Sequence, residues 1–277
     1  MRLHFAYEQD RQITTLRTCE QEPPLRVVHA FPQTNGATLL HLHNLSGGVL
    51  GGDQLALDVE LASSARVQLT TTGATRVYRC RTGAQAARQT TVVRVGAGGL
   101  LEYMPDQLIP FAGSRYQQRT LIELEQDAGL FWWETIAPGR LARGECFAYD
   151  LLQLETTILA AGLPIACERF RLESQRVSMA SSVRLGAFCY HTSFFVCRVG
   201  LPAARWHHLE QALGELTQHY TRAGEIIWGV STLVAHGLLV RAASRRGSDI
   251  TPGLLAFWTA AKRALYNEEA VPPRKIY

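Results

Sequence analysis

The first two thirds of the chain alternate between hydrophobic and polar residues with a period of two. In residues 54–61, Leu55, Leu57, Val59 and Leu61 are separated by polar or small residues, which is the pattern of a β-strand with one buried face. Similar short segments lie at residues 25–30, 88–95, 100–104, 116–125, 130–137 and 147–159. Turn signals separate them at the spacing typical of an all-β sandwich or a β-solenoid.

Three segments align without gaps as an internal repeat: VELASSARVQLT (59–70), VRVGAGGLLEYM (93–104) and IELEQDAGLFWW (122–133). Each contains a strand, a small or polar turn and a second strand. Stacked units of this kind cover one another's apolar faces. We therefore predict a mainly β body of stacked β-hairpins, either solenoid-like or sandwich-like.

Helical periodicity appears only in the last third of the chain. Pro202 suits a first helical position, and apolar residues recur at spacings of three and four from Trp206 to Tyr220, which predicts an amphipathic helix to about residue 222. A second helix is predicted at residues 253–266, with Thr251 and Pro252 as its cap and first turn.

Residues 226–240, between the two predicted helices, indicate one or two buried strands. We expect a single domain over residues 1–277, with a β-rich body at 1–200 and a helix-containing part at 201–277. Two α-helices in the C-terminal third complete the predicted fold class.

Composition narrows the range of partners. The 277 residues carry a formal net charge of +4 and 19% charged residues, and no run of Lys or Arg exceeds two, so neither nucleic acid nor an anionic membrane is expected as a partner. The sequence shows no signal peptide and no membrane-spanning segment, and we expect a cytoplasmic protein. Its six cysteines have no CxxC spacing, which favours free, buried thiols.

A glycine-rich loop precedes the first clearly alternating strand. It contains Gly47, Gly48, Gly51 and Gly52 and ends at Asp53. No helix is predicted after it and the Gly-Lys-Ser/Thr ending is absent, so it is not a phosphate-binding loop. It is either a tight turn between strands or a place where another backbone approaches closely, and Asp53 stands at the mouth of the following strand.

Two further carboxylates lie inside apolar runs: Glu134 in GLFWWETIA and Glu168 in LPIACERF. Such a carboxylate is costly to desolvate unless it is paired, hydrogen-bonded or bound to a cation. Ordinary ion pairs are one explanation, because Arg169 follows Glu168 and Arg140 lies close after Glu134. A cation-binding role is the other.

Catalytic motifs are absent. The sequence contains no GxSxG elbow and no HExxH helix, so a scaffold or binding protein is favoured over an enzyme. Two alternatives stay open. One is a β-fold hydrolase that uses Glu134 with a second acid; the other is a carbohydrate-binding module with Trp132 or Trp133 exposed.

Several longer motifs resemble the urease accessory protein UreD (UreH) family. They are GGVLGGDQLALDVEL, LTTTGATRVYR, IPFAGSRYQQRT, WETIAPGRLARGECFAYD and the terminal PPRKIY. The resemblance covers nearly the whole chain, although HNLSGG stands where many members have a proline turn. The motif residues are Gly47, Gly48, Gly51, Gly52, Tyr78, Arg79, Pro138, Gly139, Arg140, Gly144 and Glu145.

This resemblance implies a non-enzymatic maturation factor. Members of the family bind apo-urease and, with the helical protein UreF and the GTPase UreG, support GTP-dependent nickel insertion in a hetero-oligomeric complex. The resemblance implies no permanently bound cofactor and a transient passage of nickel(II) through an internal polar tunnel. Residue by residue, it assigns that tunnel to Asp53, Thr75, Glu134 and Glu168. The C-terminal helices and PPRKIY are expected to dock UreF.

Overall fold

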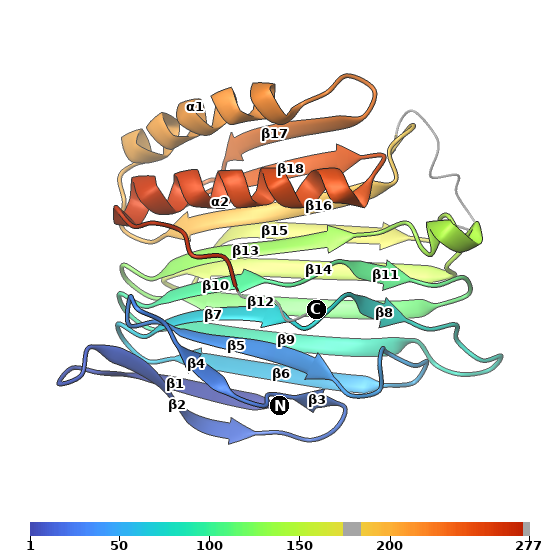
Figure 1. Ribbon diagram of the computed structural model, residues 1–277, viewed down its shortest axis with the longest axis horizontal. Coiled ribbons are helices and arrows are strands. Elements are labelled where there is room, and N and C mark those ends of the chain that lie inside the picture. Colours follow the sequence, from blue (N-terminus) through green and yellow to red (C-terminus); the bar gives the residue numbers. More distant parts are fainter. Residues whose placement is uncertain (174–183, 274–277) are drawn as a thin grey trace.

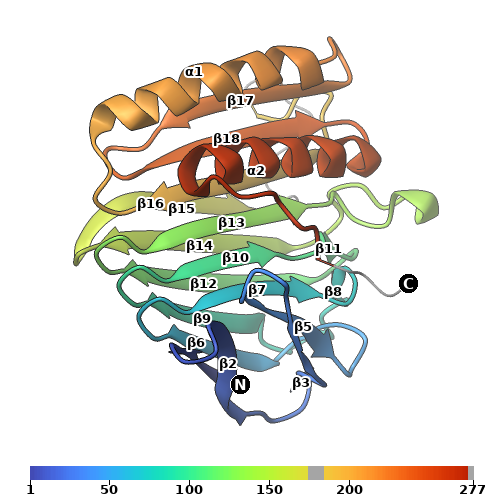
Figure 2. The same ribbon diagram turned by 60° about the vertical axis from the view of Figure 1, so that its left-hand side comes forward.

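The computed structural model describes residues 1–173 and 184–273, which form two facing β-sheets with two helices over one of them (Figures 1 and 2). The seven-stranded sheet has the order β15 (Leu163–Leu172), β14 (Leu151–Ala160), β12 (Arg115–Leu124), β9 (Ala87–Val95), β6 (Gln54–Leu61), β1 (Arg2–Glu8) and β2 (Ile13–Glu20).

The path of the eleven-stranded sheet is β17 (Ile226–Thr232), β18 (Gly237–Ser244), β16 (Tyr190–Arg198), β13 (Gly129–Ile136), β10 (Leu100–Met104), β7 (Arg66–Thr71), β5 (Thr38–Asn44) and β3 (Leu25–Arg26). Three short strands join it from the side: β4 (Ala30–Pro32), β8 (Thr75–Val77) and β11 (Leu108–Pro110). The helices are α1 (Ala203–Tyr220) and α2 (Ile250–Tyr266), with 3-10 turns η1 (Leu141–Arg143) and η2 (Gly247–Asp249).

The mainly β class is confirmed, and the repeat units stack as a solenoid. The two strands of each unit lie in different sheets: β6 and β7, β9 and β10, β12 and β13. Strands β6, β9, β12 and β14 pair in parallel, as do β5, β7, β10 and β13. The units therefore differ from hairpins, because each strand bonds to its counterpart in the next unit and not to its own partner across the turn.

The main core fills the space between the sheets. It includes the alternating residues predicted for β6, with Leu57, Val59 and Leu61 all at 5% exposure or less, and Leu69 and Leu130 from the facing sheet. Fully burying a side chain of this size stabilises a fold by about 1.5–3 kcal/mol. The period-two pattern thus identifies the inner face of each sheet.

Both helices are present where the sequence predicted them, with shifted boundaries. The first begins after Pro202 and ends at Tyr220. The second begins at Ile250, so Thr251 lies in its first turn and is not its cap. Pro252 fits there because the first N–H groups of a helix have no intrahelical acceptor. The segment between the helices forms two strands, β17 and β18, which extend the larger sheet.

Two predicted strand segments were wrong. Residues 25–30 are not one strand, because β3 ends at Arg26 and β4 begins at Ala30. Residues 147–150 are not part of β14, which begins at Leu151, because Phe147 has a positive φ of 52°, a left-handed conformation that interrupts an extended strand.

The expectation that the cysteines are buried was also wrong in part. All six described thiols are free, but Cys197 alone among them is buried, while Cys19, Cys146 and Cys167 are exposed.

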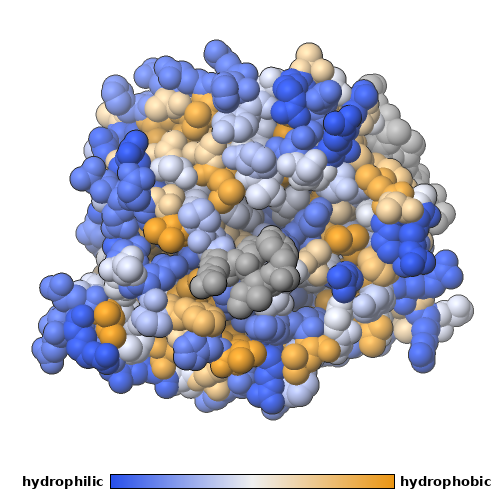
Figure 3. Space-filling model, in the orientation of Figure 1, coloured by the Kyte–Doolittle hydropathy of each residue, from blue (hydrophilic) through white to orange (hydrophobic). Residues whose placement is uncertain are grey.

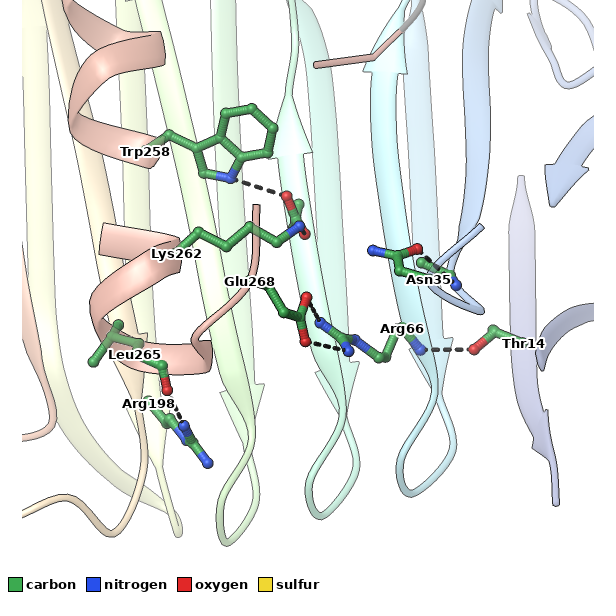
Figure 4. A network of polar contacts seen from close by, with 10 residues as sticks. Thr14, Asn35, Arg66, Arg198, Trp258, Lys262, Leu265 and Glu268 are labelled. Atoms are coloured by element: carbon green, nitrogen blue, oxygen red, sulfur yellow. Dashed lines mark hydrogen bonds and ion pairs between the residues drawn. The ribbon is translucent and has the colours of Figure 1, made fainter. Parts of the chain in front are cut away.

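Helix α2 is fixed to the larger sheet by a buried ion pair (Figure 4). Lys262 Nζ donates to Glu102 Oε1 at 2.5 Å, and Trp258 Nε1 donates to Glu102 Oε2 at 2.9 Å. Beyond the helix, Arg66 makes two hydrogen bonds to Glu268, at 2.7 and 2.6 Å. The chain after α2 therefore crosses back over β7.

The C-terminal segment stays on the sheet as far as the structure describes it, since Gln68 Nε2 donates to the carbonyl oxygen of Val271 at 3.0 Å. Residues 274–277 of the PPRKIY motif lie outside the described residues, and the UreF docking predicted for that motif stays a prediction. Hydrophilic and hydrophobic residues are interspersed on the face that carries α2 (Figure 3). Within the described ranges, no helix is long and apolar enough to cross a membrane.

Candidate functional site

A row of polar side chains crosses the otherwise apolar space between the sheets. The Tyr116 hydroxyl lies 2.9 Å from Gln89 Oε1 and 3.1 Å from Gln118 Oε1. Gln118 Nε2 then donates to Glu134 Oε1 at 2.5 Å. These residues stand on β9, β12 and β13, so the row runs across the strands and connects both sheets.

Glu134 is the central acid of this row. Besides Gln118, its carboxylate accepts a hydrogen bond from Thr156 Oγ1 at 3.4 Å. Burial raises the pKa of Glu134 to about 7, the hydrogen bond from Gln118 opposes this rise, and the negative charge of Glu168 adds to it. The carboxyl group is therefore poised between its neutral and ionised forms near neutral pH.

Glu168 enters the same region from β15, in the opposite sheet. Its Oε1 accepts hydrogen bonds from Ser193 Oγ at 2.9 Å and from Arg241 Nη2 at 2.7 Å. The side chain is 19% exposed, whereas that of Arg241 is 53% exposed. Arg169, the neighbour considered in the sequence, points to the outer face, and the cation beside Glu168 comes instead from β18.

The two acids share a small cavity of about 20 Å³. Its lining residues are Glu134, Ile136, Leu154, Thr156, Glu168, Phe170, His191 and Ser193. A volume of this size holds about one water molecule or one ion. His191 stacks on Phe170 at its edge, and burial lowers the pKa of this histidine, which favours the neutral imidazole.

The polar row ends in an open cavity on each side. One, of about 260 Å³, lies beside the glycine-rich loop and is lined by Thr75, His43, Gln89 and Tyr103 among others. The other is a groove of about 570 Å³ that shares Phe170 and His191 with the small cavity. The structure thus brings Thr75, Glu134 and Glu168 to one polar path.

Asp53 is placed differently. Its Oδ2 accepts a hydrogen bond from the Leu50 backbone N–H at 2.9 Å, and its own N–H donates to the Leu50 carbonyl oxygen. It does not line the cavity beside Thr75. Asp53 therefore closes the glycine turn, and the structure does not bring it together with Glu134 and Glu168.

The glycine-rich loop is a tight turn that another segment approaches closely. A Cβ on Gly48 would lie 2.6 Å from the Arg76 carbonyl oxygen, and one on Gly51 would lie 2.6 Å from Cys80 Sγ. Gly47 and Gly52 have positive φ angles of 72° and 90°. The Tyr78 hydroxyl donates to the Gly47 carbonyl oxygen at 3.1 Å, so the Tyr78 motif supports this loop.

The PGR…GE motif forms a second structural cluster. Arg140 Nε donates to Glu145 Oε2 at 2.8 Å, and that oxygen also accepts the Ala112 N–H at 3.1 Å. The Arg140 hydrogen bond lowers the pKa of Glu145. The guanidinium lies 4.1 Å from the centre of the Phe111 ring. This cluster ties the loop after β13 to the segment before β12.

The remaining motif residues shape the same loops. Gly139 has a φ of 137°, and a Cβ there would lie 2.9 Å from the Glu145 carbonyl oxygen; Gly144 is left-handed at a φ of 74°. The Pro138 carbonyl oxygen accepts the Phe147 N–H at 2.7 Å. Arg79 lies against Gly113, with Nε 3.2 Å from the position of a Cβ there. None of these contacts reaches the polar path.

Comparison with known proteins identifies the family. Residues 1–276 match the family described as UreD urease accessory protein. The chain belongs to the UreD family. It is 44% identical over 275 residues to the urease accessory protein UreD of Herpetosiphon aurantiacus, covering 99% of this chain and 95% of that protein. It is 31% identical to the UreD of Pseudomonas aeruginosa, covering 98% and 92% of the two chains.

Membership of the UreD family supports a role in urease maturation. The residues named for the two alternatives, Trp132, Trp133 and Glu134, are placed as follows in the described part of the chain. Trp132 and Trp133 are 2% and 6% exposed on opposite faces of β13, so neither forms an aromatic platform. The cavity that holds Glu134 and Glu168 is too small for a sugar ring. Within residues 1–173 and 184–273, no group of three or more His, Cys, Asp or Glu side chains forms a metal site.

Sequence reasoning missed most of the polar path. The strand that contains Gln118 and Thr120 was predicted, but their position on its inner face was not. That position follows from Tyr116 and Ile122, which are buried and flank the two residues at intervals of two. That signal was available in the sequence. The contact of Arg241 with Glu168 was not, because it joins β18 to β15, two strands of different sheets.

Proposed function

We propose that this UreD family member is a non-catalytic maturation factor that binds apo-urease and, together with UreF and UreG, supports GTP-dependent insertion of nickel. Nickel(II) is the cargo of the polar path between the cavity at Thr75 and the groove at Arg241. The observation that carries the proposal is the row Gln89, Tyr116, Gln118 and Glu134, continued by Glu168 and open at both ends.

The chemistry of the row suits a metal ion in transit. The polar groups that line the small cavity are carboxylate and hydroxyl oxygens with one histidine at the edge. This set holds nickel(II) more loosely than a site built from thiolates and several imidazoles. Spaced carboxylates stabilise a cation electrostatically without closing a coordination sphere. Glu134 and Glu168 are the acids of the passage, and Thr75 lines its other mouth.

The test is urease activation in cells that carry the other urease genes and nickel. The chain is absent, intact, or carries Glu134→Gln and Glu168→Gln together. We expect no activation without the chain, full activation with the intact form, and at least a tenfold loss with the double variant, while co-purification shows normal complex assembly. Single Asp53→Asn and Thr75→Val variants test the other two predicted residues.

Glu155→Gln is the matched control, because Glu155 lies on the outer face of β14 beside Arg119, away from the cavity. Full activation by the double variant would show that Glu134 and Glu168 do not carry nickel. Equal urease activity with and without the chain would refute the maturation role itself.

A further inference from the structure

At the side of the sandwich that contains β15 and β17, the larger sheet extends beyond the smaller one. The seven-stranded sheet ends at β15, while the larger sheet continues through β18 to β17. Register pairs Ile227 with Ala243 and Gly229 with Arg241 on the face that continues the inner surface of the sandwich. No described strand of the smaller sheet covers these positions, and Ile227 is 45% exposed. The groove of about 570 Å³ lies over them.

Strand β15 forms one wall of this groove and is the terminal strand of the smaller sheet as described. It is ten residues long, and within the described residues its backbone pairs with β14 alone. The other terminal strand, β17, differs: its outward N–H groups at Trp228 and Thr232 donate to Thr221 Oγ1 and Glu210 Oε1. A long unpaired edge is a template for an added strand, and within residues 1–173 and 184–273 the β17 edge is blocked while the β15 edge has no partner strand.

The lining of the groove defines what fits there. Its described lining residues include two arginines, Arg184 and Arg241, and no carboxylate. Arg241 makes one hydrogen bond, to Glu168, among the contacts of the described residues, although a guanidinium has five N–H donors. Across from it, a Cβ on Gly229 would meet no atom within 4 Å. The groove is therefore basic and apolar, with room for incoming side chains.

We infer that an extended segment of apo-urease adds to the β15 edge and lies in this groove. Its backbone continues the smaller sheet, a carboxylate binds Arg241, and apolar side chains cover Ile227 and Ala243. An acidic partner at this end lowers the electrostatic energy of a cation leaving the small cavity, so the partner here is the acceptor of the metal. The inference rests on the proposed function, which makes that acceptor apo-urease.

Two variants test the groove in the complex of this chain with UreF. Gly229→Trp fills the groove, and Arg241→Glu reverses its central charge. We expect each to weaken binding of purified cognate apo-urease at least tenfold in biolayer interferometry. The matched control is Arg88→Glu on the exposed outer face of β9, which makes the same charge reversal away from the groove. This control should bind like the parent chain.

Hydrogen exchange separates strand addition from other binding modes. Amides of β15 should become protected when apo-urease binds, and retained UreF binding shows that the variants fold. Three outcomes would each overturn the inference. They are unchanged urease binding by both variants, unprotected β15 amides, and a loss confined to UreF binding or to self-association. If the parent chain itself neither binds apo-urease nor activates it, the proposed function fails; if it does both and the groove variants match it, only the groove assignment fails.

Discussion

Glu134 and Glu168 reach one cavity of about 20 Å³ from opposite sheets, the first from β13 and the second from β15. Among the described residues, Arg241 is the cation that contacts this pair, 2.7 Å from Glu168 Oε1. Two carboxylates with one guanidinium retain a negative charge when both are ionised, which favours an additional positive ion between them.

The raised pKa of Glu134 predicts a pH-dependent difference between the parent chain and Glu134→Gln. The pKa is about 7 in the folded state and 4.5 without the fold. Between these values the unfolded chain releases its proton and the folded chain keeps it, so the free energy of unfolding of the parent falls as the pH rises and levels off above about 7. Glutamine does not titrate.

The stability of Glu134→Gln relative to the parent should therefore increase by about 1–3 kcal/mol from pH 5 to pH 8. Urea denaturation at a series of pH values measures it, with Glu155→Gln as the same chemical change on the outer face of β14. Parallel stability curves for the parent and Glu134→Gln would contradict the assigned environment of this acid.

Lys262→Met should destabilise the protein by about 3–5 kcal/mol, because it leaves the Glu102 carboxylate buried without its cation. Both side chains are at most 6% exposed. Chemical denaturation gives the free energy of unfolding. Arg263→Met, which removes an exposed ion pair with Glu269 on the same helix, should cost only about 0–1 kcal/mol. Similar losses for the two variants would argue against a buried anchor.

Gly48→Ala should destabilise the glycine-rich loop by about 1–3 kcal/mol. Its new Cβ would lie 2.6 Å from both the Arg76 carbonyl oxygen and Tyr78 Cε2, so one of the two segments must move. Gly73→Ala is the control, since its Cβ meets nothing within 4 Å and its φ is not positive. Thermal unfolding of the two variants should show a loss of stability for Gly48→Ala alone.

The cysteines should differ sharply in reactivity. Iodoacetamide should label Cys19, Cys146 and Cys167 in the folded protein and leave Cys197 unmodified, because Cys197 is fully buried and burial raises its pKa to about 12. Burial also raises the pKa of Cys146, so its labelling should accelerate as the pH rises from 7 to 9. Peptide mass spectrometry measures both effects, and rapid native labelling of Cys197 would contradict its placement.

Much of the secondary structure and part of the site were predictable. The inner face of β6 followed from alternation at Leu57 and Val59, and α1 from apolar spacing between Trp206 and Tyr220. For the site, the apolar context of Glu134 and Glu168 indicated an unusual environment for both. The same reasoning grouped Asp53 with these two acids, but the structure does not place Asp53 beside them. The sequence did not reveal that the Asp53 carboxylate accepts the Leu50 N–H.

The sequence by itself determined which segments are strands or helices, which strand faces are buried, and to which family the chain belongs. Those features depend on backbone periods and on motif residues a few positions apart. The tertiary structure alone decided that the repeat units bond to their neighbours, that Arg241 contacts Glu168, and that no described strand pairs with the outer edge of β15. These features depend on how strands distant in the sequence are arranged, and a period-two pattern is the same for every partner that a strand could have.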